Sequence, residues 1–433
     1  MARQAIPQDL RDVRLHDPAA YEDPGPMYRR LREDAPVFWC EPLSCWVVSK
    51  YEDVKYVCSA DEDFSVAFGA TIGPQLGALR QIPLPDDIPG RLAQLLKRRD
   101  AIARRANATA DSEHLLRVDP PRHTMMRTIL RSSFTPRAVG GLEEFVRAVT
   151  HEAFASIEPN STKDFVAAIA LPIPLYTIAR LLGVRLEDRD NFKQWTDVIL
   201  QVNDGSFDPK NDGDTALDSV LAEMYSYFAV RIGEARTQAT EDLVGTLASR
   251  TIADEPLSDG TIQTLCRMLL VGGNETTRHL MSGAALALAQ HPEQRALLAV
   301  SPELMSGAIE EFLRWVTPVR HICRTTKKPI ELRGETIEAG EYVMALLGSA
   351  NRDEEVWKDA DVFNVTRPVQ PMHLAFTYGT HMCLGQHVTR LETRIVFENL
   401  LARFPAYSIA GDIRRRPMLL LNGIEEMPIR FAA

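Results

Sequence analysis

The sequence predicts a mainly helical fold with a minor β part, and three observations carry this prediction. Apolar residues recur at the helical spacing of about 3.6 residues through most of residues 142–313. Short β-rich runs lie near the two ends of the chain, within residues 37–48 and after residue 316. No internal repeat or separating linker is apparent, so we expect one large domain spanning residues 1–433.

Composition narrows the function classes. The chain has 433 residues, is 45% hydrophobic, and carries 49 Lys and Arg against 59 Asp and Glu, a net charge of −10. This balance is typical of a globular enzyme, whereas a disordered chain has fewer core-forming residues and a nucleic-acid-binding protein is usually basic. Six scattered cysteines without a C-x-x-C pair indicate a reducing compartment, and the N-terminus resembles neither a signal peptide nor a membrane anchor. We therefore expect a cytoplasmic enzyme that binds neither membrane nor nucleic acid.

In the N-terminal part we expect a flexible segment over residues 1–20 and a helix over residues 26–32. Two β-rich runs, residues 37–39 and 46–48, follow on either side of Pro42. Residues 66–115 are long and irregular, although residues 89–105 can be drawn as an amphipathic helix. A connection of this length is usually functional or disordered, so we expect a mobile substrate-access region.

In the C-terminal half, residues 258–290 form a helix candidate that Ser258 or Asp259 caps and that ends before His291-Pro292. Another helix is expected over residues 384–404. The apolar runs 418–421 and 427–431 enclose the turn signal Asn422-Gly423 and predict a β-hairpin.

Residues 376–385, with the sequence FTYGTHMCLG, carry the most chemical information. Cys383 follows a glycine-punctuated loop and precedes a helix, whose N-terminal N–H groups favour a thiolate. Gly379 and Gly385 would let the backbone pass close to a bulky flat group. A lone cysteine in such a place is more often structural.

Gly272-Gly273 interrupts the centre of the 258–290 helix and is followed by Asn274-Glu275-Thr276-Thr277. Each glycine weakens the helix by roughly 1 kcal/mol relative to alanine, so tertiary packing must compensate, and both permit close approach of a flat ligand. A following hydroxyl could hydrogen-bond back to the helix and open its ladder. Taken alone, the pattern is more often a packing site with a polar face.

Taken together, these motifs point to a known family. Phe-x-x-Gly-x-His-x-Cys-x-Gly closely resembles the haem-binding loop of the cytochrome P450 family. The resemblance implies haem b as cofactor, Cys383 as the thiolate ligand of the iron, and His381 as a contact of a haem propionate. Phe376, Gly379 and Gly385 belong to the same loop, and Thr377 stands where members commonly have glycine.

Gly272-Gly273-Asn274-Glu275-Thr276 resembles the oxygen-binding groove of that family. The resemblance implies that Thr276 hydrogen-bonds dioxygen and that Glu275 belongs to a proton relay, because cleavage of the O–O bond consumes two protons. Both are candidate catalytic residues, and their presence favours dioxygen over peroxide as the oxidant.

Several charged positions support this reading. Glu311 and Arg314 lie at i, i+3, ordinarily a surface pair, but here they resemble the family's Glu-x-x-Arg, with Arg367 as the third member of a structural triad. Buried propionates need paired cations. The resemblance implies that His123, Arg127 and Arg324 supply them, although His123 and His381 alone could be satisfied core histidines.

The run Arg122–Arg137 contains no acidic residue, which makes it a basic strip on an acidic protein. A solvated helix face is the plain explanation, and docking of an acidic redox partner is the sharper one. Nothing in the chain resembles a flavin or iron–sulfur module. We therefore expect electrons from NAD(P)H to arrive through a ferredoxin reductase and a ferredoxin, at a monomeric enzyme.

The resemblance covers roughly residues 20–431 and implies a triangular P450 domain of the soluble bacterial type. It implies a monooxygenase that oxidises a hydrophobic small molecule in natural-product (secondary) metabolism, free or bound to a carrier protein. A steroid or terpenoid hydroxylase, a haem-thiolate enzyme that rearranges its ligand without a reductase, and a haem sensor remain alternatives. The expected pocket is mostly apolar and comprises Val202, Leu269, Leu270, Asn274, Val319, Ile322 and Leu421.

Overall fold

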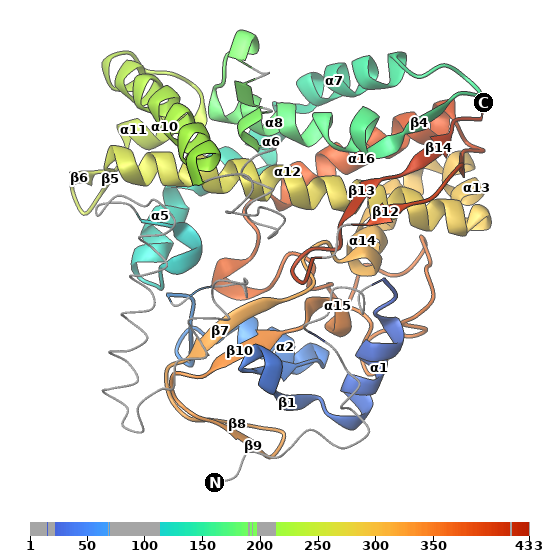
Figure 1. Cartoon of the computed structure of the whole chain (residues 1–433), viewed down its shortest axis with the longest axis horizontal. Coiled ribbons are helices and arrows are strands. Elements are labelled where there is room, and N and C mark those ends of the chain that lie inside the picture. The colour runs from blue at the N-terminus through green and yellow to red at the C-terminus, as the bar shows by residue number, and fades with distance from the viewer. Residues whose placement is uncertain are drawn as a thin grey trace.

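The computed structural model describes residues 22–67, 113–188, 214–415 and 418–432, together with Leu15, Gly69, 191–192 and 194–196. Within these residues it confirms a mainly helical architecture with small sheets (Figure 1). Val202, the expected helix over residues 89–105, nearly all of the segment 1–20 and most of the expected access region 66–115 lie outside the described residues. No helix among those described is long and apolar enough to cross a bilayer.

Helix α12 (Asp259–Gln290) runs through the middle of the molecule and contacts α8, α10, α14 and α16 (Figure 1). The predicted cap is present, because the Ser258 side chain accepts a hydrogen bond from the N–H of Thr261 at 3.2 Å. The other α-helices of the described residues are α1 (Gly25–Asp34), α2 (Tyr51–Ser59), α5 (Arg122–Arg131), α6 (Pro136–Gly140), α7 (Glu143–Ala155), α8 (Pro172–Leu182), α10 (Asp214–Thr237), α11 (Leu243–Ser249), α13 (Pro292–Val300), α14 (Met305–Val316), α15 (Leu347–Ala350) and α16 (Gln386–Arg403).

The largest described sheet has five strands in the order β1-β2-β10-β7-β3. Only β2 and β10 pair in parallel in this sheet; its other neighbours are antiparallel. Its strands are β1 (Val37–Cys40), β2 (Cys45–Val48), β3 (Phe64–Ser65), β7 (Ile322–Thr326) and β10 (Tyr342–Ala345). Smaller sheets use β4 (Thr162–Asp164), β5 (Thr251–Ile252), β6 (Glu255–Pro256), β8 (Ile330–Leu332), β9 (Glu335–Ile337), β11 (Ser408–Ile409), β12 (Arg414–Arg415), β13 (Ile424–Glu426) and β14 (Pro428–Arg430).

The predicted C-terminal hairpin is wrong in its pairing. Strand β13 pairs with β12, and β14 pairs with β11 and β4, while Leu421 forms a single bridge to Val319. Asn422 is held at the end of α14 instead of in a tight turn: its N–H donates to the carbonyl of Pro318 and its Nδ2 to that of Val316, both at 2.8 Å. These tertiary hydrogen bonds override the local turn preference.

Two apolar cores meet at α12. One contains the first half of the helix together with α8, α10 and α11; the other contains its second half with α7, α14 and α16. Gly272 is exposed in the middle of this otherwise largely buried helix. An exposed backbone position at the centre of a core helix marks an opening beside α12.

Candidate functional site

The loop 376–385 is held by its own backbone in front of α16. The N–H of Cys383 donates to the carbonyl of Phe376 at 2.9 Å, and the Thr377 hydroxyl donates to the carbonyl of His381 at 3.1 Å. Burial raises the pKa of the Cys383 thiol, against a lowering by the N–H of Gly385 and by Arg127. A metal ion bound at the sulfur would overcome that burial and hold the thiolate form.

Two residues of this loop adopt a left-handed backbone. Gly379 has φ +76°, and a Cβ added to it would lie 2.7 Å from Cα of Ser59 in α2. Glycine is therefore required there both for its conformation and for close packing. Thr377 has φ +61°, which costs an L-residue roughly 1–2 kcal/mol. This conformation explains why glycine is the usual residue at that position in the family that the loop resembles.

A cluster of buried basic side chains lies beside the loop. The rings of His123 and His381 are 3.9 Å apart between centroids. Both nitrogens of His123 and Nε2 of His381 are buried without a hydrogen-bond partner among the described residues. Arg324 is 4% exposed and donates to the carbonyl of Cys323 at 2.9 Å, yet no carboxylate in the described chain forms an ion pair with it. The cluster therefore has donors without acceptors.

The electrostatics of the cluster point the same way. Burial, and then Arg127, lower the pKa of His123 to about 4. Burial, and then His123 and Arg324, lower the pKa of His381 to about 2. Burial also lowers the pKa values of Arg127 and Arg324. The guanidinium groups of Arg127 and Arg324, together with the neutral rings of His123 and His381, fit the carboxylates of a haem, whose binding would give the buried ring nitrogens hydrogen-bond partners.

At the opening in α12 the two glycines have different surroundings. A Cβ added to Gly272 would meet nothing within 4 Å, whereas one added to Gly273 would lie 3.3 Å from Cδ1 of Ile178 in α8. Gly272 thus faces open space and Gly273 allows close helix packing. Thr276 shares the open side, where its hydroxyl donates to the carbonyl of Gly272 at 2.8 Å.

Helix geometry corrects part of the expected pocket. With about 100° per residue, Leu269, Gly272 and Thr276 fall on one face of α12, while Leu270 and Asn274 lie on the far side of it. Leu270 is fully buried in the core and Asn274 is 2% exposed. We therefore remove these two residues from the pocket face that contains Thr276.

The remaining described pocket candidates come from two segments that meet. Val319 and Leu421 are joined by their β-bridge. Ile322 begins strand β7, two residues before Arg324 of the basic cluster. These apolar positions therefore lie on chain segments that are connected to the cluster.

Glu275 is 2% exposed and its carboxylate contacts two neighbours on its own helix. Arg278 Nη2 lies 3.0 Å from Oε1 of Glu275, and Nε2 of His279 lies 3.6 Å from the same oxygen. The sequence analysis missed both partners. Their spacing of i+3 and i+4 from an acid was the available signal.

The predicted structural triad is assembled at the end of α14. All five N–H donors of Arg314 have acceptors, namely the two carboxylate oxygens of Glu311 at 2.7 and 2.8 Å and three backbone carbonyls. Arg367 Nε donates to the same carboxylate at 3.0 Å. This cluster is complete without any ligand.

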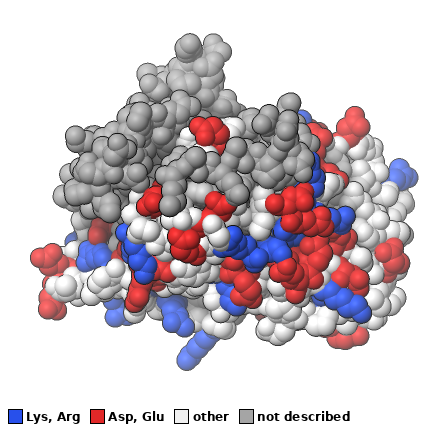
Figure 2. All heavy atoms as spheres, turned by 90° about the horizontal axis from the view of Figure 1, so that it is seen from below, with Lys and Arg blue, Asp and Glu red and all other residues white. Residues whose placement is uncertain are grey.

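The basic strip Arg122–Arg137 divides into two kinds of arginine. Arg122 is bound to Glu113 at 2.9 Å, and Arg127 donates inward to the carbonyl of Met382. Arg131 and Arg137 are exposed and form no ion pair within the described chain. By contrast, acidic and basic side chains alternate on the part of the lower face that can be described (Figure 2).

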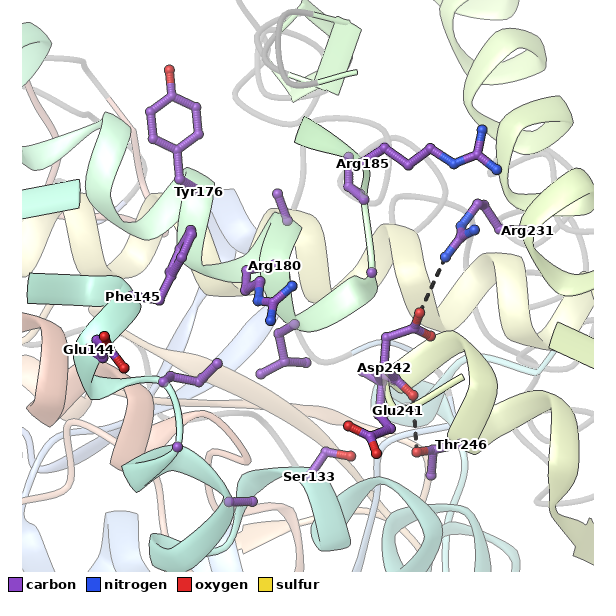
Figure 3. A pocket seen from close by; sticks show the side chains of 18 of the residues that line it. Ser133, Glu144, Phe145, Tyr176, Arg180, Arg185, Arg231, Glu241, Asp242 and Thr246 are labelled. Carbon is purple, nitrogen blue, oxygen red and sulfur yellow. Dashed lines mark hydrogen bonds and ion pairs between the residues drawn. The ribbon is translucent and has the colours of Figure 1, made fainter. Parts of the chain in front are cut away.

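A groove of about 1130 Å³ between α7, α8 and α11 is lined by none of the residues predicted to bind haem or substrate, although Ser132 and Ser133 of the basic strip border it (Figure 3). Its charged side chains are paired in part. Arg231 contacts Asp242 at 3.2 Å and Glu234 at 2.6 Å, and Asp242 caps α11 through the N–H of Gly245 at 2.8 Å. These contacts stabilise the fold.

Comparison with known proteins agrees with the geometry. A family model described as cytochrome P450 matches residues 302–418. Cytochrome P450 107B1 of Saccharopolyspora erythraea is 33% identical over 433 residues, which cover 98% of this chain and 99% of that protein. Similar solved structures include CYP109E1 from Bacillus megaterium in complex with testosterone (TM-score 0.79, 28% identity, 95% of this chain and 100% of that one). P450BioI in complex with acyl carrier protein ligated to hexadec-9Z-enoic acid has the same TM-score, identity and coverage.

Proposed function

This chain belongs to the cytochrome P450 family and is a haem-thiolate monooxygenase, and on that premise we propose that Cys383 is the thiolate ligand of its haem iron. The observation that carries the proposal is the buried cluster of His123, His381, Arg127 and Arg324 beside the cysteine loop. The N–H groups of this cluster can bind the carboxylates of haem, and the sulfur of the neighbouring Cys383 can bind its iron.

In this proposal each side chain has a stated task. Bound haem supplies the electron transfer and dioxygen chemistry. His123 and His381 donate hydrogen bonds to the propionates, and Arg324 both donates to them and supplies a compensating positive charge. Arg127 holds the backbone at Met382 and adds positive charge beside the sulfur.

Thr276 and Glu275 are proposed to move protons at the opening in α12. The Thr276 hydroxyl already lies on the open face, and it must exchange its bond to the Gly272 carbonyl in order to donate to dioxygen. Glu275 is buried one residue earlier, where bulk water does not flood the site. An alcohol at the opening and an acid behind it form a relay of two groups.

We propose a hydrophobic small molecule of natural-product metabolism as the substrate, seated against Leu269, Val319, Ile322 and Leu421. The carrier-protein complex of P450BioI supports a carrier-bound substrate. The testosterone complex of CYP109E1 supports a steroid as the alternative. A spectral-shift screen with free steroids and with acyl groups on a carrier protein separates the two, because a ligand that displaces iron-bound water changes the spin state.

For electron supply we propose that a ferredoxin docks over Arg131, Arg137 and the 46%-exposed Met125 of α5. None of the six cysteines forms a disulfide, which supports a cytoplasmic location. Replacing both arginines by glutamate should lower the rate of ferrous-enzyme formation by reduced ferredoxin. Reduction by dithionite should not change.

The haem ligand is tested by Cys383→Ser, with Cys266→Ser as the matched control because Cys266 is buried in α12. The reduced wild-type protein with carbon monoxide should show the red-shifted Soret band of thiolate ligation. Cys383→Ser should lose that band and Cys266→Ser should keep it. Retention of the band by Cys383→Ser would overturn the proposal.

A further inference from the structure

The proposed relay acid is enclosed by two groups that the relay itself does not use. Arg278 Nη2 donates a hydrogen bond to Oε1 of Glu275 at 3.0 Å, and Nε2 of His279 lies 3.6 Å from the same oxygen. All three side chains are buried, with 8%, 0% and 2% of Arg278, His279 and Glu275 exposed. A buried carboxylate with converging donors is held in one orientation.

The protonation of His279 follows from its other ring nitrogen. Nδ1 lies 3.3 Å from the backbone nitrogen of Ile424 and accepts that N–H, so it carries no proton. On this hydrogen bond the ring proton belongs on Nε2, which lies 3.6 Å from Oε1 of Glu275 and 3.4 Å from Nη2 of Arg278. Strand β13 thus fixes the tautomer that makes His279 a donor toward the acid.

We propose that Arg278 and His279 are positioning residues for Glu275, and that the amide of Ile424 sets His279 in place. This inference rests on the proposed role of Glu275 in proton delivery. Arg278 supplies the compensating charge, His279 supplies a neutral donor, and together they keep the carboxylate at the end of the relay instead of turned into the core. Misplacement of a reacting group by about 1 Å can cost up to about a hundredfold in rate.

The geometry defines conservative and disruptive replacements for each residue. Arg278 contacts Glu275 through one nitrogen, so Arg278→Lys can keep the contact and Arg278→Met cannot. Glutamine has an oxygen for Ile424 and an amide N–H for Glu275, so His279→Gln can keep both contacts and His279→Leu neither. His291→Leu is the control, because His291 lies at the end of the same helix and contacts the carbonyl of Ala287.

The first measurement is ferredoxin-driven NAD(P)H consumption by the haem enzyme in H₂O and D₂O. Arg278→Met and His279→Leu should each slow consumption about tenfold and raise the solvent isotope effect. Arg278→Lys, His279→Gln and His291→Leu should stay within about twofold of the wild type. Equal impairment of the conservative and disruptive variants would show a general role in folding and overturn the inference.

The second measurement does not depend on activity. Hydrogen exchange at the Ile424 amide should speed up in His279→Leu but not in His279→Gln, and ¹⁵N spectra of the reduced carbon monoxide form should show His279 as a neutral ring protonated at Nε2. A doubly protonated His279 ring, or unchanged hydrogen exchange at the Ile424 amide in His279→Leu, would show that Ile424 does not set His279 in place.

Glu275→Gln separates this inference from its premise. If Glu275→Gln behaves as the wild type, the proposed proton role itself fails. If Glu275→Gln is impaired while Arg278→Met and His279→Leu retain wild-type rates and isotope effects, only the positioning role fails.

Discussion

Two buried charged clusters of this protein are built in opposite ways. The cluster of Glu311, Arg314 and Arg367 is complete, since every donor of Arg314 has a protein acceptor. The cluster of His123 and Arg324, with His381, leaves three imidazole nitrogens without a hydrogen-bond partner among the described residues. Both clusters cost desolvation energy, but only the first recovers it from the protein itself.

The difference separates a structural cluster from a binding site. A complete network rigidifies the backbone around it, and here Arg314 joins the carbonyls of Asn351, Ala360 and Val362. A buried network with unpaired polar groups lowers the stability of the ligand-free fold. A ligand that pairs those groups restores the lost stability when it binds. Native proteins leave few buried polar groups unpaired, so several in one place indicate a missing ligand.

The largest expected effect comes from breaking the complete cluster. Arg314→Met leaves the Glu311 carboxylate buried with half of its partners, and should lower the free energy of unfolding by about 3–5 kcal/mol in urea titrations. Arg147→Met is the control, because Arg147 pairs with Glu143 on the surface and should cost about 0.5 kcal/mol. Similar losses of unfolding free energy in Arg314→Met and Arg147→Met would contradict the structural importance of the buried cluster.

Glu392 tests the cost of burying an acid that has a hydrogen bond to Thr177 but no ion-pair partner among the described residues. Burial raises the pKa of this carboxyl from 4.5 to about 8, and its Oε2 has no hydrogen-bond partner among the described residues. A raised folded-state pKa gives stability that is complete below pH 4.5 and is lost as the pH rises toward 8. The free energy of unfolding of Glu392→Gln should therefore equal that of the wild type near pH 4.5 and be about 3 kcal/mol larger at pH 7.

The check is the free energy of unfolding of both proteins across that pH range. Glu398→Gln, which removes a half-buried acid of the same helix together with its contacts to Arg147 and Arg394, should be less stable than the wild type at pH 7. A difference between Glu392→Gln and the wild type that does not grow with pH would contradict the uncompensated burial of Glu392.

The incomplete cluster should respond differently from the complete one. Arg324→Gln should speed haem loss to apomyoglobin about tenfold, equivalent to about 1.4 kcal/mol, because a charged donor to a propionate is removed. The unfolding free energy of the apoprotein should not fall, since the replaced cation had no carboxylate partner among the described residues. Arg367→Gln should do the reverse, destabilising the apoprotein with little effect on haem loss.

Sequence reasoning predicted the parts of this protein that local signals encode. Ser258 and His291-Pro292 marked the ends of α12, and the loop 376–385 was identifiable from its spacing of Phe, Gly, His and Cys. It failed where long-range contacts decide. Asn422 joins α14 instead of forming a turn, and Ile424 reaches back to His279 across 145 positions of sequence. The division of Arg122–Arg137 into arginines that bind other parts of the described chain and arginines that are exposed likewise depends on Glu113 and Met382.

The smallest expected effect lies inside the cysteine loop, at Thr377. Its φ of +61° disfavours a β-branched residue, while its hydroxyl gains a hydrogen bond to the carbonyl of His381 at 3.1 Å. Thr377→Gly removes the strain, the hydrogen bond and some chain rigidity together, so its net change in unfolding free energy should stay within about 1 kcal/mol of zero. Thr377→Val keeps the strain and loses the hydrogen bond, so it should be less stable than Thr377→Gly by about 1 kcal/mol. Urea titrations of the two variants decide the matter: equal stability would mean that the left-handed backbone at this position costs nothing, and the usual glycine of the family would need another explanation.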